Sequence, residues 1–480
     1  MRAMPLNIGK LHFIGIGGIG MSGIAEVLCA LGYEVQGSDL SESANVERLR
    51  KSGMKVFIGQ EADNVKDAEI IIISSAIQDD NPELQAARAA RKTIVRRAEM
   101  LAEIMRLKWS IAIAGTHGKT TTTTMVGTML EEAGYDPTVI NGGIVNRYGT
   151  NTRIGESDWI VAEADESDGT FTKLPATIAV VTNIDAEHLD HYGTYDNIKA
   201  AFRRFIDNLP FYGFAVLCSD HPAVQALIPN LSDRRLITYG FNAQADVCVS
   251  NVRPSAQGNT FDVTFASWMN DGTELAVKDI FLPMLGEHNV LNSLASLAIA
   301  HEMGTPVATM KKAMKNFSGV KRRFTQTGVS NGVTVIDDYA HHPVEIRAVL
   351  KAAREAVQKS GKKVVAVMQP HRYTRLRDHM DDFASCFNDA DSVIIADVYA
   401  AGEDPIENVG KESLAQRAKN LGHKDVSVMP SLEDLPVMIY ERVEEGDFVI
   451  CLGAGNISAW AYDLPGQLDE LNEQNTQGVA

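Results

Sequence analysis

The chain has 480 residues, enough for about three domains of ordinary size, so a small stapled scaffold is excluded. Its 45 basic and 62 acidic residues give a net charge of −17, which opposes the phosphate backbone and argues against a nucleic-acid partner. Five widely spaced cysteines without a C-x-x-C pair indicate neither a disulfide framework nor a zinc site. Because the chain has no apolar run of membrane-spanning length and no signal peptide, we expect a cytoplasmic protein without a membrane partner.

Short apolar runs alternate with longer amphipathic stretches along the chain, which is typical of parallel α/β units. The predicted strands are Leu11–Ile16, Glu69–Ile73, Trp109–Ala114, Trp159–Ala162, Ile178–Thr182, Val333–Ile336, Val364–Met368, Val393–Ala396 and Phe448–Leu452. Residues 246–272 predict antiparallel strands, and the polar tail from Asp463 predicts a loosely ordered end. A charged helical stretch at 96–108 and a basic cluster at 321–323 mark two predicted domain boundaries. Ligands of parallel sheets bind beyond the carboxyl ends of strands, so the residues after each run are the candidates for function.

A glycine-rich loop with the sequence GIGGIG follows the first predicted strand at residues 15–20 and opens a helix near Met21. Its bare backbone and the helix N-terminus can approach a diphosphate. Asp39 follows the next strand, where an acid can meet a ribose hydroxyl. The loop therefore predicts a dinucleotide or nucleotide-diphosphate site, and a tight turn without a ligand is the alternative.

A second loop, AGTHGKTT at residues 114–121, again joins a predicted strand to a helix. Lys119 is available for β- and γ-phosphates and Thr120 for Mg²⁺, although Ile113 occupies the place of the first glycine in the strict Walker pattern. The five threonines at 120–124 add hydroxyls where an anion would lie. The loop predicts a triphosphate site, with an N-capped buried helix as the alternative.

Two acidic segments follow strands of the same block, EADESD at residues 163–168 and TNIDAEHLDH at residues 182–191. Four acids in six residues repel one another unless a cation compensates, and Mg²⁺ with oxygen ligands is the natural partner of a triphosphate. A solvated acidic loop is the alternative for each segment alone. His188 and His191 stay open between metal ligand, base and helix-capping roles.

The segment GEHNVLN at residues 286–292 puts Asn289 and Asn292 on one helix face, where their amides can read a base edge. Capping of the helix by Asn289 is the competing interpretation. In the last block polar clusters follow four strands, at residues 337–343, 369–375, 397–403 and 453–456. They predict a crevice for an amino acid, whose carboxylate suits the fork of an arginine, and decorated surface loops are the alternative.

Five ordered motifs together resemble the Mur ligases, nearly from end to end: GTHGKTT at 115, EADESD at 163, TNIDAEHLD at 182, GEHNVLN at 286 and DDYAHHP at 337. The resemblance implies an α/β fold of three domains. These are a Rossmann-like UDP-sugar domain over 1–107, a central P-loop-type ATPase α/β domain over 108–320 and a Rossmann-like amino-acid-binding domain over 321–480. It implies an ATP-dependent, ADP-forming ligase of peptidoglycan precursor synthesis that forms an acyl phosphate and needs Mg²⁺, with two ions expected.

The motifs GIGGIGM at 15 and QPHRYTR at 369 are similar to those of family members that use UDP-N-acetylmuramate, L-alanine and ATP. Those three are therefore the expected substrates, and a monomer or weak homodimer is expected. A murein tripeptide ligase of the same family stays open, although it tends to lack the QPHRYTR run. An NAD-dependent dehydrogenase would leave the phosphate loop unused, and a nucleotide-gated binding module would bind ATP without turnover.

The resemblance also implies residue roles at the matching positions. For the UDP-sugar these are Gly15, Gly17, Gly18, Gly20 and Asp39, with Tyr339 and Arg375 on the substrate side. For ATP they are Gly115, Thr116, His117, Gly118, Lys119, Thr120, Thr121, His288, Asn289 and Asn292. For metal they are Thr120, Glu163 and His188, and for catalysis Lys119, His188, Arg322, His341, His371, Arg372 and Arg375. Several members carry a carbamoylated lysine where this chain has Phe202, with Lys199 a turn earlier, which argues against a carbamate ligand.

Overall fold

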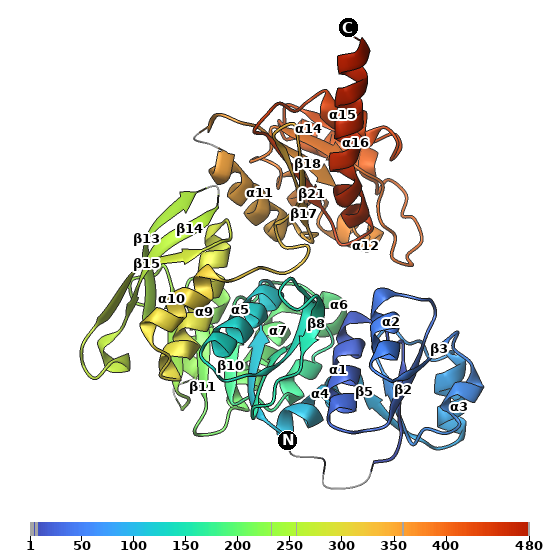
Figure 1. Cartoon of the computed structure of the whole chain (residues 1–480), viewed down its shortest axis with the longest axis vertical. Coiled ribbons are helices and arrows are strands. Elements are labelled where there is room, and N and C mark those ends of the chain that lie inside the picture. The colour runs from blue at the N-terminus through green and yellow to red at the C-terminus, as the bar shows by residue number, and fades with distance from the viewer. Residues whose placement is uncertain (1–3, 5–7, 232, 256, 358–359, 479–480) are drawn as a thin grey trace. The chain divides into compact units, whose positions relative to one another are not determined.

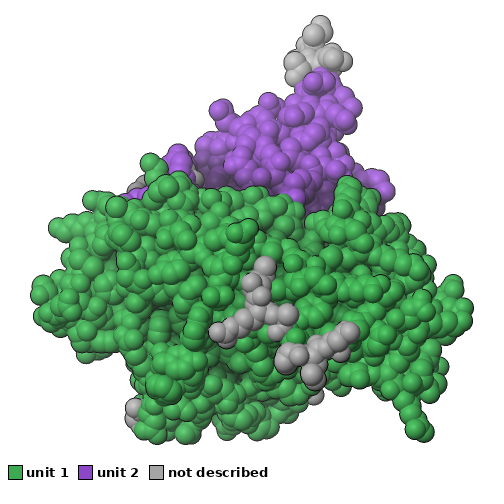
Figure 2. All heavy atoms as spheres, turned by 60° about the horizontal axis from the view of Figure 1, so that its bottom comes forward, with its two compact units in different colours: residues 1–251, 261–280, 291–318 green, residues 252–260, 281–290, 319–480 purple. Residues whose placement is uncertain are grey.

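The structure is a computed structural model that describes residues 4, 8–231, 233–255, 257–357 and 360–478, and its strands form three sheets (Figure 1). These residues divide into two compact units (Figure 2). Unit 1 comprises residues 1–251, 261–280 and 291–318, and unit 2 comprises residues 252–260, 281–290 and 319–480. Within the described ranges, no helix is both long and apolar enough to cross a membrane.

The first sheet has five parallel strands in the order β3-β2-β1-β4-β5. Its central strands β1 (LHFI) and β4 (IIII) are short and mostly apolar, which suits a sheet that is covered on both faces. The helix after the glycine loop begins at Ile19, two residues before the predicted start. The elements are β1 (Leu11–Ile14), α1 (Ile19–Ala30), β2 (Val35–Asp39), α2 (Ala44–Lys51), β3 (Lys55–Ile58), η1 (Ala62–Val65), β4 (Ile70–Ile73), α3 (Pro82–Ala89), β5 (Thr93–Arg96) and α4 (Arg97–Arg106).

The second sheet has ten strands in the order β15-β14-β13-β12-β11-β10-β6-β9-β7-β8. Two strands, β13 and β14, lie in the stretch predicted from residues 246–272, whereas β7, β8, β11, β12 and β15 were not predicted. The first elements are β6 (Trp109–Ala114), α5 (Lys119–Glu132), β7 (Thr138–Val145), β8 (Thr150–Arg153), β9 (Trp159–Glu163), η2 (Thr170–Lys173), β10 (Ile178–Val181), α6 (Leu189–Tyr192) and α7 (Tyr195–Asp207). The others are β11 (Phe214–Cys218), α8 (Pro222–Leu227), η3 (Ile228–Asn230), β12 (Leu236–Gly240), β13 (Val247–Ser255), β14 (Gly258–Phe265), η4 (Ser267–Met269), β15 (Leu275–Leu282), α9 (Glu287–Glu302) and α10 (Val307–Lys315).

The first two sheets share one hydrophobic core inside unit 1. Met21 of α1, Met105 of α4 and Ile140 of β7 belong to the same buried cluster. A Cβ at Gly23 of α1 would lie 2.3 Å from Thr152 Oγ1 of β8, so the backbone of this helix touches the edge of the second sheet. The predicted boundary near residue 107 therefore lies between two sheets that share this buried cluster. Both predicted domain boundaries stay predictions.

The third sheet lies in unit 2, in the order β16-β17-β21-β18-β19-β20, with only β16 antiparallel to its neighbour among the described strands. One core packs α11, α13 and α14 on one face, and another packs α15 and α16 on the opposite face. Figure 1 shows α11 and α16 on opposite sides of β17 and β21. The elements are β16 (Thr325–Ser330), β17 (Val333–Asp338), α11 (Pro343–Val357), β18 (Val364–Met368), α12 (Tyr373–Asp378), α13 (Met380–Ala384), β19 (Ser392–Ile395), α14 (Lys411–Asn420), β20 (Val426–Val428), α15 (Leu435–Tyr440), β21 (Phe448–Leu452) and α16 (Ile457–Gly478).

All nine predicted strands are present, with ends shifted by no more than two residues. The prediction of a loose tail from Asp463 was wrong, because α16 continues to Gly478 with Pro465 inside it. Its apolar residues Ala461, Leu464 and Leu468 recur at helical spacing and are buried against the sheet. The burial of this stripe holds the segment as a helix despite its polar composition.

Candidate active site

The first glycine loop lies at the carboxyl end of β1, where α1 begins. Gly15 has a left-handed φ of 77°. The N-cap of α1 is Gly18, so no side chain caps this helix, and the N–H groups of its first turn can bind an anion. Gly17 N donates to Asp39 Oδ2 at 2.9 Å, and a Cβ on Gly17 would lie 2.8 Å from the same oxygen. Asp39, predicted to meet a ribose hydroxyl, therefore braces the loop in this structure.

Arg97, the first residue of α4, contacts this loop and was not predicted from the sequence. A Cβ at Gly20 would lie 3.2 Å from Arg97 Nη1, so the guanidinium lies against the N-terminal turn of α1. Arg97 Nη2 also donates to Asp165 Oδ2 at 3.0 Å, in the acidic loop after β9. One cation thus joins the predicted diphosphate loop to the predicted metal loop. Its signal in the sequence is the basic pair Arg96–Arg97 at the start of α4, which spacing alone does not connect to either loop.

The segment after β10 supports the second glycine loop. Thr182 Oγ1 donates to His117 O at 2.6 Å, and the Asn183 carboxamide accepts from His117 N at 2.7 Å while donating to His117 O at 3.0 Å. Asp185 N donates to Thr116 Oγ1 at 2.8 Å, and its Oδ2 lies 3.3 Å from His117 Nε2. The first half of the predicted acidic segment therefore fixes the conformation of the phosphate loop.

Lys119 is the buried cation of this loop. Its Nζ donates to Gly115 O at 2.6 Å and to Thr116 O at 3.0 Å, and it lies 2.8 Å from Glu166 Oε2. Gly115 has a φ of 139°, which favours glycine, and the loop ends at Gly118 with a φ of 81°. The lysine is thus folded onto its own loop, where phosphate oxygens can replace the carbonyl oxygens that it now contacts.

Three carboxylates surround the single positive charge of Lys119. Burial opposes the charged lysine, but Glu166, Glu163 and Asp165 outweigh that effect and raise the pKa of Lys119 above its ordinary value. Burial also raises the pKa of Glu166, against the opposing effect of Lys119. His188, in a left-handed conformation with φ 55°, places Nε2 3.8 Å from Glu166 Oε1. The pocket is therefore an acidic site that is suited to a cation.

The predicted metal ligands Thr120 and Glu163 lie at neighbouring ends of the sheet. β6 and β9 pair so that Ile113 stands opposite Glu163, and Glu163 Oε2 accepts from Gly142 N at 2.8 Å. Thr120 and Thr121 are buried in the first turn of α5, both under a tenth exposed. Hydroxyl and carboxylate oxygens are the donors that Mg²⁺ prefers, so this set fits the ion that the sequence predicts.

The two residues that bear on a carbamate ligand, Lys199 and Phe202, both lie in α7. Phe202 is fully buried, and its ring centroid lies 5.0 Å from that of Phe171. Lys199 pairs with Asp196 at 2.6 Å and lies over the ring of Tyr195. The expectation that this protein lacks a carbamate ligand stays a prediction.

The predicted adenine-binding residues belong to α9. A Cβ at Gly118 would lie 2.6 Å from Asn292 Oδ1, so Asn292 contacts the phosphate loop. Asn289 lies inside the first turn of α9, which begins at Glu287, and its Nδ2 donates to Leu285 O at 2.8 Å. The capping interpretation for Asn289 was therefore wrong. Burial lowers the pKa of His288 to about 4, so its ring is neutral at pH 7.

The four polar clusters of the last block lie at one edge of the third sheet, as predicted. Gly453 N donates to Asp338 O at 3.1 Å, which joins the ends of β17 and β21. Gln369 Nε2 donates to Asn456 Oδ1 at 2.7 Å, and His371 forms a bridge with Tyr399 next to β19. The order of the strands brings together segments that are far apart in the sequence.

Histidine and arginine side chains gather at this edge. The His371 ring stacks on Tyr399 with centroids 5.6 Å apart, and its Nδ1 lies 3.3 Å from Arg375 Nη1. His341 lies 5.8 Å from His371 between ring centroids. Burial, then His341, Arg375 and Arg372, lower the pKa of His371 to about 4, so it is neutral at pH 7. Arg372 is exposed, with a left-handed φ of 70°.

Arg322 is held within unit 2. Its Nη2 donates to Gly453 O at 2.7 Å and to Gly455 O at 3.2 Å. Its guanidinium lies 4.8 Å from the centroid of the Tyr339 ring. Arg322 and Tyr339 are thus part of the same edge as the histidines, and the predicted reach of Arg322 toward a γ-phosphate stays a prediction.

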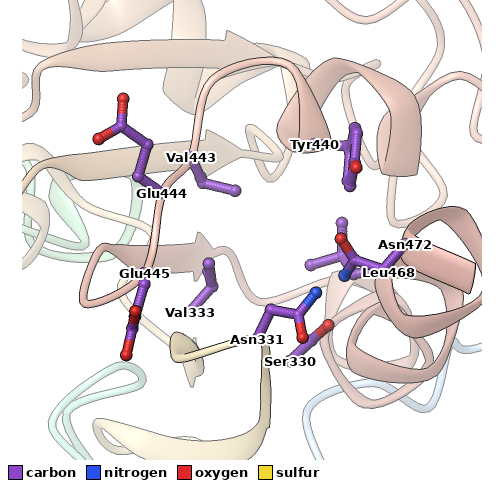
Figure 3. Close-up of a pocket in the computed structure, with 9 residues that line it drawn as sticks. All are labelled: Ser330, Asn331, Val333, Tyr440, Val443, Glu444, Glu445, Leu468 and Asn472. Atoms are coloured by element: carbon purple, nitrogen blue, oxygen red, sulfur yellow. The ribbon is translucent and has the colours of Figure 1, made fainter. Parts of the chain in front are cut away.

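Figure 3 shows a different cavity of unit 2, of about 610 Å³, lined by residues that include Val333, Tyr440, Glu444 and Glu445. Val333 begins β17, and Glu444 and Glu445 precede β21. The cavity therefore lies at the amino ends of these strands, opposite the edge that holds the predicted residues. Because ligands of parallel sheets bind at the carboxyl ends, we do not assign the site to this cavity.

Comparison with known proteins identifies the class to which this arrangement belongs. Residues 10–109 match the model described as "Mur ligase family, catalytic domain", residues 113–300 the "Mur ligase middle domain" and residues 322–455 the "Mur ligase, glutamate ligase domain". The chain belongs to the Mur ligase family. It is 60% identical over 471 residues to the UDP-N-acetylmuramate–L-alanine ligase of Brucella anthropi, covering 98% of this chain and 100% of that protein.

Two solved structures have the same architecture. The UDP-N-acetylmuramate–alanine ligase of Thermotoga maritima is similar with a TM-score of 0.79 and 30% identity, covering 97% of this chain and 100% of that one. A murein peptide ligase of Psychrobacter arcticus has a TM-score of 0.69 and 22% identity, covering 96% and 99%. The second likeness concerns the fold alone.

Proposed function

We propose that this protein is an ATP-dependent ligase that joins L-alanine to the lactyl carboxylate of UDP-N-acetylmuramate, in the cytoplasmic synthesis of peptidoglycan precursors. The observation that carries the proposal is the presence of two glycine-rich anion loops, residues 15–20 and 115–118, around one core of unit 1. A dehydrogenase needs one such loop, whereas a ligase that phosphorylates a nucleotide-sugar needs both. The choice of L-alanine is supported by relatives that match along nearly the whole chain.

The reaction needs activation because a carboxylate is a poor electrophile. Transfer of the γ-phosphoryl group to the lactyl carboxylate releases ADP and gives an acyl phosphate, which the amine of alanine attacks with release of phosphate. Bringing two anions together requires positive charge and precise positioning, which are the main catalytic terms in phosphoryl transfer. We assign the charge to Lys119, and the positioning of ATP to the loop at Gly115–Thr121 with His288, Asn289 and Asn292.

Mg²⁺ would neutralise the phosphate oxygens, and we propose two ions. Thr120, Glu163 and His188 are the residues that would hold them. The support is the donor chemistry of these side chains and the acidic surroundings of Lys119, described above. Calorimetry of ATP binding with Mg²⁺ and with a chelator tests this assignment. The gain in ATP affinity that Mg²⁺ produces should be lost in Glu163→Gln.

Unit 2 supplies the residues for alanine and the muramoyl group. Arg372 and Arg375 provide forks that bind a carboxylate, while Tyr339 and His341 line the same edge. The amine must attack unprotonated, and its ordinary pKa is about 8, so an edge rich in arginine favours the neutral form. His371 is neutral at pH 7 and adds no charge to that edge, and Arg322 completes the cationic set.

The decisive experiment measures phosphate release with ATP and UDP-N-acetylmuramate while L-alanine, glycine, L-serine or a tripeptide is added in turn. We expect L-alanine to give the highest kcat/KM. Preference for the tripeptide would instead support a murein peptide ligase. A nicotinamide absorbance change would support a dehydrogenase, and ATP affinity without turnover would support a binding module. Light scattering of the purified protein tests the expectation of a monomer or weak homodimer.

A further inference from the structure

Glu166 has no role in the reaction as proposed above, yet it occupies the centre of the acidic site. Its carboxylate contacts Lys119 through both oxygens, at 2.9 Å and 2.8 Å, and its side chain is only 4% exposed. The same carboxylate lies 3.8 Å from His188 Nε2. It therefore stands between the residue assigned to ATP phosphates and a residue assigned to metal.

The other acids of this loop have different attachments. Asp165 pairs with Arg97 at 3.0 Å, and Asp168 accepts from Thr170 N at 3.0 Å. Glu163 accepts from a backbone amide of β7, as described above. Glu166 is thus the acid of the run 163–168 that pairs with the phosphate-loop lysine.

This pair cannot stay as it is when ATP binds. Lys119 now uses its three donors on two loop carbonyls and Glu166, so a phosphate oxygen must replace at least one of them. A buried carboxylate that has lost its cation is costly and would also repel the phosphates. Because Tyr192 OH donates to Glu166 O at 2.6 Å, the backbone is anchored and the adjustment falls on the side chain.

We propose that Glu166 is a positioning residue that exchanges Lys119 for the metal: it holds the lysine in the ATP-free site and then turns its carboxylate toward the Mg²⁺ side, next to His188. This inference rests on the proposed ATP-binding role of the loop. It makes Mg²⁺ the compensating charge that allows Lys119 to leave Glu166. The residue therefore couples metal binding to nucleotide binding.

The test is calorimetry of ATP binding to the full-length protein, with and without Mg²⁺, for Glu166→Gln and the wild type. Without Mg²⁺, the variant should bind ATP about tenfold more tightly, because Lys119 is no longer paired with a carboxylate and one repelling charge is gone. With Mg²⁺, the gain in affinity that the metal produces should shrink by about tenfold. The matched control is Asp168→Asn, the same loss of charge in the same loop, which should leave both quantities within about twofold of wild type.

Weaker ATP binding without Mg²⁺, or an unchanged metal-dependent gain, in Glu166→Gln would overturn the inference. Equal changes in Asp168→Asn would also overturn it, because they would indicate a general effect of charge. Glu166→Asp keeps the charge and shortens the reach to Lys119, so it should also tighten metal-free ATP binding if the glutamine variant does not fold. Absence of ATP binding in the wild type would instead contradict the proposed function itself.

Discussion

Replacing Gly118 with alanine should weaken ATP binding by crowding the phosphate loop. Gly118 has a φ of 81°, and the added Cβ would lie 2.6 Å from Asn292 Oδ1. Asn292 is only 7% exposed, so its carboxamide has little room to move away. Both the loop conformation and the position of Asn292 should therefore change.

Two energies contribute to this effect. A left-handed alanine costs about 1–2 kcal/mol wherever it stands. Displacing a buried amide from its contacts costs about 1–3 kcal/mol more. We expect at least a tenfold rise in the Kd of ATP, which corresponds to about 1.4 kcal/mol, with UDP-N-acetylmuramate affinity within about twofold of wild type.

Gly134 provides the matched control, since its φ is 84° and no described atom outside Gly134 and its two chain neighbours lies within 4 Å of its Cβ position. Gly134→Ala should lower the Tm by the strain term alone and leave ATP affinity unchanged. Thermal melting and calorimetry of both variants separate the two contributions. The reasoning fails if Gly118→Ala binds ATP like the wild type, or if Gly134→Ala loses as much ATP affinity.

Three further variants test other parts of the site. Lys119→Ala should abolish phosphate release while UDP-sugar binding persists in calorimetry, and loss of that binding would reassign the loop. Arg97→Gln should weaken UDP-sugar binding by about tenfold, since the guanidinium lies against Gly20, and an unchanged Kd would contradict this role. The pKa of His371 is lowered to about 4 from an ordinary value of about 6.5, so the unfolded chain takes up the proton first as the pH falls. Its contribution to stability is complete above about pH 6.5 and is lost toward pH 4, so the Tm of His371→Gln should fall less over that window than the Tm of the wild type. Identical slopes would show that His371 does not titrate as described.

Much of the fold could be predicted because the nine predicted strands are short apolar runs bounded by glycine or polar residues, whereas β8 (TNTR) and β16 (TQTGVS) have no such pattern. The tail was mispredicted because Pro465 and its polar neighbours hide the apolar stripe at Ala461, Leu464 and Leu468, whose meaning depends on a sheet to cover it. β15 was missed because polar residues such as Lys278 and Asp279 interrupt its apolar pattern. Burial by distant segments, which a local pattern does not contain, decided both cases.

The sequence predicted which loops form the site, but not which side chains pair within it. The acidic run at 163–168 indicated a cation, but nothing in its spacing says that Glu166 faces Lys119 while Asp165 faces Arg97. Arg97 is far from Gly20 in the sequence and reaches it only because α1 and α4 pack together. Such pairings depend on tertiary packing, so the structure is needed to find them.

The continuous core beneath the first two sheets determines how this enzyme can be divided in the laboratory. A recombinant fragment that ends near residue 107 would leave α1 and α4 without the second-sheet residues that share their buried cluster, such as Ile140, and would expose apolar surface to water. Large exposed apolar patches promote aggregation. Fragments for ligand screening or crystallisation should therefore keep both glycine-rich loops on one piece of chain.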